Sequence, residues 1–246
     1  MKKILVLWFS VFLISCNSDS EIDCFKKQGD VIEKFAETDY FDKIHIGLNI
    51  ELIVSQSDET KIKVEYGKNL IDNVHFEVEN YELKITNKSN CSMLRNYHPA
   101  KVFVSIPNLV KIHSGSQYSV KSAGVLKFPS LLLESGIIEE SLPISFFDIE
   151  VDNQELKIND NVSTAFRVSG KTEKLDIRFW SDAGRFEGEN LIANEVAFYH
   201  RSSNDIIIYP ITKVTGKLAG TGNLVLKNTP EILDVEQIYT GSVIYP

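Results

Sequence analysis

Five short segments decide the fold: LKI at 156–158, LDI at 175–177, VAF at 196–198, VTG at 214–216 and LDV at 233–235. Each segment opens a unit of similar build, and the units begin 19, 21, 18 and 19 residues apart. A polar, turn-prone patch follows in every unit, and in most units a second apolar run comes next, as at 206–208. A repeat of about 20 residues with two short β-type runs and no helical pattern predicts an all-β solenoid, in which each coil buries its apolar face against its neighbours.

Alternating apolar residues extend the β prediction upstream of the repeat. Residues 44–54 are apolar at every even position, which is the period of a strand with one buried face. Shorter runs of the same kind occur at 62–66, 76–78, 83–85 and 102–106. Residues 110–120 resemble a first copy of the repeat, and residues 131–138 fit a copy less well. We therefore predict one continuously stacked domain over residues 38–246, with a seam between residues 86 and 102.

Composition and charge exclude one class of partner. The 246-residue chain has a formal net charge of -8, and removal of two N-terminal lysines with a leader would leave 24 basic against 34 acidic residues, or -10. Nucleic-acid phosphates are bound by clustered Lys and Arg, and the sequence contains no basic run. We therefore expect no nucleic-acid partner. Separately, a chain of this length can bury a large core without disulfide or metal cross-links.

Residues 1–15 have the features of a signal peptide. Two lysines precede an apolar run at 4–14, which as a helix would be about 16 Å long, too short for a hydrocarbon core of about 30 Å. This segment is therefore predicted to be a leader. Its ending, Leu13-Ile14-Ser15-Cys16, resembles the lipobox of bacterial lipoproteins, which implies that Cys16 is lipidated after cleavage. The alternative is an ordinary secretory signal with an incidental Cys16.

Residues 16–37 are predicted to be the lipidated Cys and a tether. Asn17 after the lipidated Cys resembles lipoproteins that leave the inner membrane, so we expect an outer-membrane protein held by its N-terminal lipid, facing the periplasm or the cell surface. Several acyl chains hold a protein stably on a bilayer. Cys24 and Cys91 remain after processing, and they either form a disulfide or stay unpaired, because sequence gives no distance between them.

The order of these patterns resembles the head-GIN domain family. The motifs that carry the likeness are Val104-x-Ile106-Pro107-x-Leu109, Ser114-Gly115-Ser116 and the closing Tyr239-Thr240-Gly241-Ser242-Val243-Ile244-Tyr245. The likeness covers roughly residues 38–246. The family is named for auto-transporter adhesins and is common among bacterial lipoproteins. The resemblance implies a right-handed parallel β-helix-like solenoid, similar in outline to pectin-lyase proteins but without their catalytic residues, and a non-enzymatic role in adhesion or surface recognition.

Recurring aromatic residues are the candidates for ligand binding. In a solenoid, residues that recur once per coil line up as ladders, and an exposed ladder of Trp and Tyr would bind sugar rings or a protein partner. Tyr118, Trp180 and Tyr199 are predicted to point outward, and Arg201 could bind a carboxylate or sulfate of a sugar. The alternative is that the recurring aromatic residues point inward and fill the core.

Three turn residues could instead be catalytic. Asp160, Asp182 and Asp205 lie in consecutive units, and glycan hydrolysis uses two carboxylates about 5 to 10 Å apart. However, Asp is also favoured in turns, and the three residues lie at different offsets from their unit starts. We therefore predict a non-enzymatic protein. A polysaccharide-processing enzyme that uses these aspartates beside Arg185 or Arg201 is the first alternative, and a ligand-free structural envelope protein is the second.

No cofactor or metal is predicted. The five histidines, His45, His75, His98, His113 and His200, are scattered without ligand spacing. The glycines of the repeat have no following helix or P-loop lysine, so they are interpreted as turn residues. The pattern runs on to residue 246, and the last coil must be protected. Either the N-terminal strands cover that end, which we prefer, or it is a self-association surface.

Overall fold

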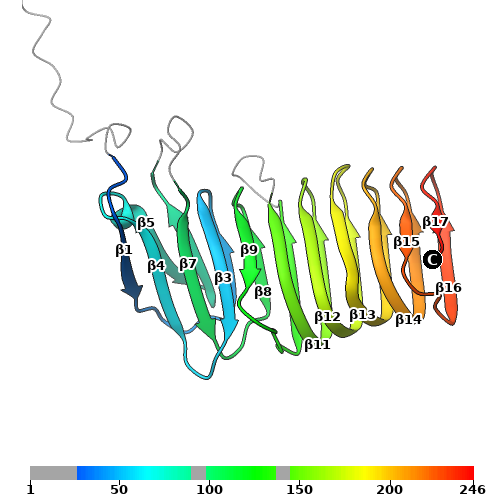
Figure 1. The fold of residues 1–246 in the computed structure, drawn as a ribbon, viewed down its shortest axis with the longest axis horizontal. Coiled ribbons are helices and arrows are strands. Elements are labelled where there is room, and N and C mark those ends of the chain that lie inside the picture. Colours follow the sequence, from blue (N-terminus) through cyan, green and yellow to red (C-terminus); the bar gives the residue numbers. More distant parts are fainter. Residues whose placement is uncertain (1–26, 90–97, 137–144) are drawn as a thin grey trace, which may run out of the picture.

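A computed structural model describes residues 27–89, 98–136 and 145–246. They form one long stack of β-strands with a single short 3-10 helix, η3 (Ile71–Asn73) (Figure 1). Among these described residues, no helix has the length and apolar character needed to cross a lipid bilayer. The predicted signal peptide, Cys16, Cys24 and Cys91 lie outside the described residues.

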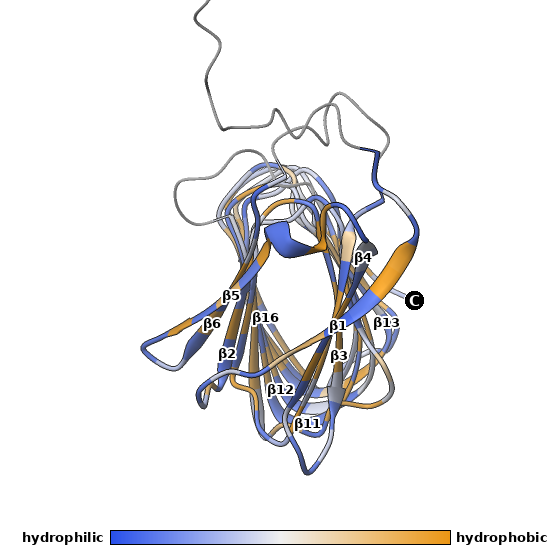
Figure 2. Cartoon of the chain, turned by 90° about the vertical axis from the view of Figure 1, so that its left-hand side faces the viewer, coloured by the Kyte–Doolittle hydropathy of each residue, from blue (hydrophilic) through white to orange (hydrophobic). Residues whose placement is uncertain are grey.

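The strands belong to one 17-stranded sheet that is wound into two opposing faces (Figure 2). The front face in Figure 1 contains β1 (Val31–Ala36), β4 (Lys61–Gly67), β7 (Ala100–Ile106), β3 (Ile50–Gln56), β9 (Ser119–Ser122), β15 (Leu224–Leu226) and β17 (Val243–Ile244). The back face contains β5 (Val74–Glu79), β6 (Glu82–Asn87), β2 (Lys43–Ile46), β8 (Lys111–Ser114), β10 (Ser130–Ser135) and β16 (Ile232–Gln237). Four long strands run through both faces by bending at the lower edge: β11 (Phe146–Asp160), β12 (Ala165–Phe179), β13 (Arg185–His200) and β14 (Ile206–Leu218).

Strand register confirms the predicted solenoid. The first residues of the five units, Leu156, Leu175, Val196, Val214 and Leu233, pair one with the next in parallel strands. Leu131 of β10 pairs with Leu156 in the same way, so the imperfect copy at 131–138 also joins the stack. The coil length is about 21 residues. Because the units are nearly equal in length, each unit position lies against the same position of the next rung, about 4.8 Å away.

The core is built from these repeated inward positions. The Phe147 and Phe166 rings, on neighbouring rungs, are stacked with centroids 4.8 Å apart and an interplanar angle of 14°. Phe179 reaches Phe166 from the back half of the same strand, with centroids 6.1 Å apart. All three side chains are fully buried. The phenylalanines at these repeated inward positions therefore fill the core.

The N-terminal rungs are stacked in an order that differs from the sequence. Strand β2 lies between β6 and β8, and β3 lies between β7 and β9. Strands β1 and β4 pair antiparallel, as do β4 with β7 and β5 with β6. The prediction that N-terminal strands stack on the solenoid is confirmed. Their spatial order departs from the sequence order because the chain reverses after β3, where β4 pairs antiparallel with β7.

The predicted single strand over residues 44–54 is two strands in the structure. Strand β2 ends at Ile46 and β3 begins at Ile50, on the opposite face. Between them Asn49 takes a left-handed conformation with φ of 62°, and its side chain accepts a hydrogen bond from Gln117. The alternation continues through this corner because the even residues on both sides of it point inward. Alternation alone therefore could not locate the corner.

The two ends of the stack differ from our expectation. Figure 1 shows β1 at the opposite end from β16 and β17, so the preferred prediction that N-terminal strands cover the C-terminal end is wrong. Within the described residues, β16 pairs only with β14 and β17 only with β15. Five apolar or aromatic side chains of this end are 43% to 60% exposed: Ile232, Ile238, Tyr239, Ile244 and Tyr245. Self-association through this end stays a prediction.

Adjacent phenylalanines in β11 provide a matched test of the core. Phe147 is fully buried, whereas Phe146 is half-buried on the outer surface under the guanidinium of Arg167. We expect Phe147→Ala to lower the free energy of unfolding by about 3–5 kcal/mol, because it leaves a cavity in the Phe stack. Phe146→Ala should cost about 1 kcal/mol or less. Urea denaturation followed by circular dichroism measures both, and equal losses would contradict the inward assignment of Phe147.

Candidate functional site

One row of outward side chains runs along the back face. It is formed by the fourth residue of each unit, and register places its members side by side on successive strands: Glu134, Asn159, Arg178, Tyr199, Lys217 and Glu236. We call this set the outer row. His113 of β8 pairs with Glu134 and so continues the row toward the N-terminal end.

Hydrogen bonds link four neighbouring rungs along the outer row. The Trp180 indole Nε1 donates to Asn159 Oδ1 at 2.9 Å, and Asn159 Nδ2 donates to Glu134 Oε1 at 2.9 Å. Glu134 Oε2 lies 2.8 Å from Lys111 Nζ and 3.2 Å from His113 Nδ1. These bonds, with the one from His113 the strongest, lower the pKa of Glu134 to about 2. Glu134 is therefore a carboxylate at neutral pH, and it fixes the amide of Asn159 for Trp180.

Trp180 and Tyr199 form an aromatic pair on this surface. Their ring centroids are 4.9 Å apart at an interplanar angle of 31°, and Trp180 is 47% exposed. The indole is held at its N–H by Asn159 and at its face by Tyr199. A side chain that is exposed but already fixed loses little conformational freedom when a ligand binds. The pair is therefore a preorganised contact surface.

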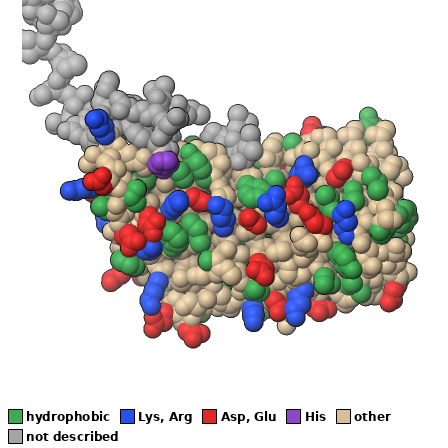
Figure 3. Space-filling view, in the orientation of Figure 1, with side chains coloured by type: hydrophobic (Ala, Val, Ile, Leu, Met, Phe, Trp, Pro, Cys, Tyr) green, Lys and Arg blue, Asp and Glu red, His purple; other side chains and the backbone are tan. Residues whose placement is uncertain are grey.

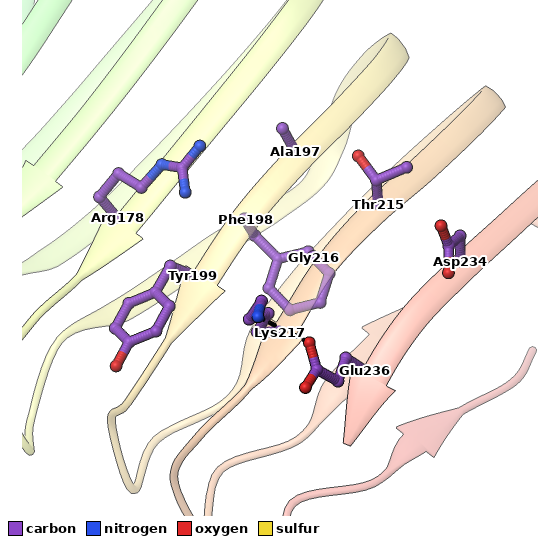
Figure 4. A pocket seen from close by; sticks show the side chains of 9 residues that line it. All are labelled: Arg178, Ala197, Phe198, Tyr199, Thr215, Gly216, Lys217, Asp234 and Glu236. Atoms are coloured by element: carbon purple, nitrogen blue, oxygen red, sulfur yellow. Dashed lines mark ion pairs between the residues drawn. The ribbon is translucent and has the colours of Figure 1, made fainter. Parts of the chain in front are cut away.

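A shallow hollow of about 370 Å³ lies beside this pair (Figure 4). Its lining is Arg178, Ala197, Phe198, Tyr199, Thr215, Gly216, Lys217, Asp234 and Glu236. Figure 4 shows Tyr199 at one side and Asp234 and Glu236 at the other, with Lys217 between Tyr199 and Glu236 and with Thr215 between Ala197 and Asp234. Lys217 Nζ is 2.7 Å from Glu236 Oε2, and Arg178 Nε is 2.7 Å from Asp176 Oδ1. Both cations of the lining are therefore already paired.

The front face carries a row of charged side chains (Figure 3). Basic and acidic side chains alternate along this row. Register gives its central members as Lys121, Asp148, Arg167 and Glu187 on successive strands. Arg167 Nη2 lies 3.0 Å from Glu187, and Lys121 Nζ lies 2.7 Å from Glu51. Exposed pairs of this kind contribute little energy each, and their charges are largely compensated within the face.

The structure brings together two of the four candidate binding residues. Trp180 and Tyr199 are in contact, and Arg201 follows β13, one rung beyond Trp180. Arg201 is exposed, with Nε 4.0 Å from Asp182 Oδ1. Tyr118 lies half-buried on the turn between β8 and β9, three rungs before Trp180, so it is not part of the aromatic pair.

The three candidate catalytic aspartates do not line one edge. Asp160 points into the interior and is fully buried. Asp182 is exposed on a turn, and Asp205 Oδ1 accepts hydrogen bonds from the backbone N–H and side-chain amide of Asn223. Arg185 pairs with Glu187 at 2.8 Å. Within the described residues, no group of three His, Cys, Asp or Glu side chains could hold a metal ion.

Sequence reasoning missed Asn159, Glu134 and the hollow. A signal for them was present, because Asn159, Arg178, Tyr199, Lys217 and Glu236 all stand three residues after a unit start. Alignment of the five units by their first residue would have placed these side chains in one row. To predict the hollow, the second residues of the units must also be compared. In two consecutive units this residue has a short side chain, Ala197 and Thr215.

Two buried ionisable residues lie directly beneath this surface. Asp160 and His200 occupy the fifth unit position on either side of Phe179, and both are fully buried. Their oxygens and ring nitrogens have no hydrogen-bond partner of good geometry. Burial raises the pKa of Asp160 to about 6, opposed by the nearby Thr164, and burial lowers the pKa of His200 to about 4.

Comparisons with known proteins bear on the family and the fold. Residues 40–230 match the model of a family described as "Putative auto-transporter adhesin, head GIN domain". A solved structure from Bacteroides fragilis, titled "putative adhesin", is 19% identical with a TM-score of 0.77, over 88% of this chain and 97% of that chain. A "putative adhesin" from Parabacteroides merdae is 16% identical with a TM-score of 0.63, over 89% and 97%. No curated protein matches the chain.

A third solved structure is described by a different function. A "putative lipid binding protein" from Parabacteroides distasonis is 17% identical with a TM-score of 0.57, over 89% of this chain and 97% of that chain. At these identities the three structures share the fold of this chain, and they say nothing about its ligand.

Removal of the buried carboxyl should stabilise the fold at neutral pH. Folded Asp160 keeps its proton to about pH 6, whereas the unfolded carboxyl loses it near 3.8. The contribution of Asp160 to stability therefore falls as the pH rises between these values. We expect Asp160→Asn to exceed the wild-type free energy of unfolding by up to about 3 kcal/mol above pH 6, with the difference vanishing near pH 4.

Urea denaturation at pH 4 and pH 7.5 measures this difference. The pH dependence that His200 contributes is opposite to that of Asp160. The pKa of His200 is about 4 in the folded protein and 6.5 in the unfolded chain, so its contribution to stability rises as the pH increases between these values. The Asp160→Asn protein should therefore gain stability from pH 4 to pH 6.5 more steeply than wild type. The exposed Asp182→Asn is the matched control. A constant difference between Asp160→Asn and wild type at both pH values would contradict the buried, protonated state of Asp160.

Proposed function

The chain belongs to the head GIN family of auto-transporter adhesin-like proteins, and from that premise we propose that it is a lipid-anchored, non-enzymatic surface-recognition protein of the outer membrane. The membership supports a place in the cell envelope. The lipid anchor at Cys16 is supported by the lipobox-like ending of residues 1–15. The proposal places ligand binding on the back face, at Trp180 and Tyr199.

The fixed, exposed Trp180 is the observation that carries the recognition proposal. Binding hot spots are enriched in Trp, Tyr and Arg, which offer large contact areas at low entropic cost. Trp180 has this combination because Asn159 and Tyr199 hold it while 47% of its surface stays in solvent. The ligand is a glycan or a protein surface, both of which use such aromatic contacts.

The position of the pair along the stack suits this role. The lipid anchor would precede residue 27 and so attach at the end that holds β1. On the back face, β12 is six strand spacings from β5, which corresponds to about 29 Å. Trp180 follows β12, so it would stand away from the anchored end and remain accessible to a ligand in front of the membrane.

Lipidation is tested by replacing the acceptor thiol. We expect Cys16→Ser to move the protein from the membrane fraction to the soluble fraction and to abolish incorporation of labelled palmitate, because Cys16 is the residue that would carry the acyl chains. Cys24→Ser is the matched control and should stay in the membrane fraction. A Cys16→Ser protein that remains in membranes and still incorporates palmitate would refute the anchor.

Recognition is tested by truncating the exposed indole. Cells that display the protein should be retained on mucin-coated or fibronectin-coated surfaces, and Trp180→Ala should lower retention about tenfold on the surface that is bound, since a central aromatic contact is lost. Tyr245→Ala, a similarly exposed aromatic residue at the C-terminal end, is the control. If Trp180→Ala, displayed at the wild-type level, is retained as well as wild type, then the aromatic pair is not the recognition site.

A further inference from the structure

We propose that the hollow beside Tyr199 binds one neutral sugar unit of a glycan. This inference rests on the proposed recognition function of the same face and specifies its ligand. The sugar would stand over Ala197 and Thr215, with the ring of Tyr199 at one side and Asp234 at the other, beside the ion pair of Lys217 and Glu236 (Figure 4).

The shape of the hollow follows from side-chain length on neighbouring rungs. The second residues of the five units form their own row, which reads Lys157, Asp176, Ala197, Thr215 and Asp234. Ala197 and Thr215 are the two short members of this row and stand on adjacent strands, whereas longer side chains flank them. Two strand spacings amount to about 10 Å, and the flanking side chains bound the hollow at both ends along the stack. That length suits a compact ring better than a long chain.

The walls offer the two kinds of contact that a sugar ring requires. Trp180 supports the ring of Tyr199 from the preceding rung, so Tyr199 is a fixed apolar wall for the C–H face of a sugar. Asp234 forms no ion pair with the described residues and is exposed, and Thr215 provides a hydroxyl at the floor. Carboxylates accept short, strong hydrogen bonds from hydroxyl donors. Hydroxyl groups opposite the aromatic wall would therefore be bound.

The charge of the lining favours a neutral glycan over an anionic one. Lys217 is paired with Glu236 and Arg178 with Asp176, so neither cation is free for a sugar carboxylate or sulfate. Asp234 adds an unpaired negative charge to the same space. An anionic unit would therefore meet repulsion without a compensating cation.

The backbone around the hollow disfavours an extended peptide. Both β13 and β14 have hydrogen-bonded neighbours on each side, namely β12 and β14 for β13, and β13 and β16 for β14 on the back face. Peptides commonly bind to β-structure by adding a strand to a free edge, and none is available at this place. A peptide would therefore depend on side-chain contacts alone.

The experiment uses Trp180 as the reporter. The chain has two tryptophans, Trp8 and Trp180, so the full chain with Trp8→Phe and Cys16→Ser carries a single, local fluorophore without lipid. This protein is applied to an array of neutral, uronic-acid, sialylated and sulfated glycans. The neutral oligosaccharide bound most strongly is then titrated while Trp180 emission is followed, and gelatin is titrated in parallel as the peptide probe.

We expect binding to neutral glycans only, with a saturable change in Trp180 emission. Thr215→Tyr fills the hollow without touching Trp180, and it should weaken binding about tenfold or more. Asp234→Asn should also weaken it, and this exposed substitution keeps the test valid if Thr215→Tyr fails to fold. Val225→Tyr, the same kind of change on the front face, is the matched control and should bind as wild type.

Three results would overturn the inference. They are binding restricted to anionic glycans, binding of gelatin that Thr215→Tyr removes, and absence of binding to every neutral glycan on the array. In each of these cases, a loss of surface retention by Trp180→Ala would still support the recognition function, so the failure would concern the sugar alone. If Trp180→Ala retention is also unchanged, the recognition proposal fails together with this inference.

Discussion

Parallel pairing between rungs of nearly equal length is the constraint on which the rest of this structure depends. It places each unit position against the same position of the next rung, so Leu156 lies on Leu175 and Phe147 on Phe166. An inward position must then be apolar in every coil, because any rung that breaks the row leaves its neighbours without contacts. The same pairing aligns the outward positions, such as Asn159, Arg178 and Tyr199, but these positions can be polar because they face solvent.

Two ionisable exceptions to the apolar interior, Asp160 and His200, lie beneath the candidate site. Burial disfavours the charged form of each: Asp160 keeps its proton up to about pH 6, and His200 stays neutral down to about pH 4. Phe179 separates them, so each is surrounded by apolar rows rather than by the other. A long stack tolerates such residues because the many apolar contacts of the neighbouring rungs hold the coil in register.

Outward positions are where this fold leaves room for function. The front face uses them for compensated charge pairs such as Arg167 and Glu187. The back face uses them for a hydrogen-bonded chain that ends on an exposed indole, with a hollow where two rungs carry short side chains. Because the solenoid needs no particular residue at these places, proteins that share the fold are free to differ here, and the fold does not name the ligand.

By itself the sequence determined the coil length and the inward rows, because a period of about 20 residues and a polar–apolar alternation are local properties of the chain. The tertiary structure alone decided three things. It placed β2 and β3 between later strands, because β4 turns back and pairs antiparallel with β7. It joined Trp180 to Asn159 and Tyr199 across rungs. It also opened the hollow at Ala197 and Thr215. Each of these depends on contacts between residues about 20 or more positions apart, and their energies appear only when the coils are stacked.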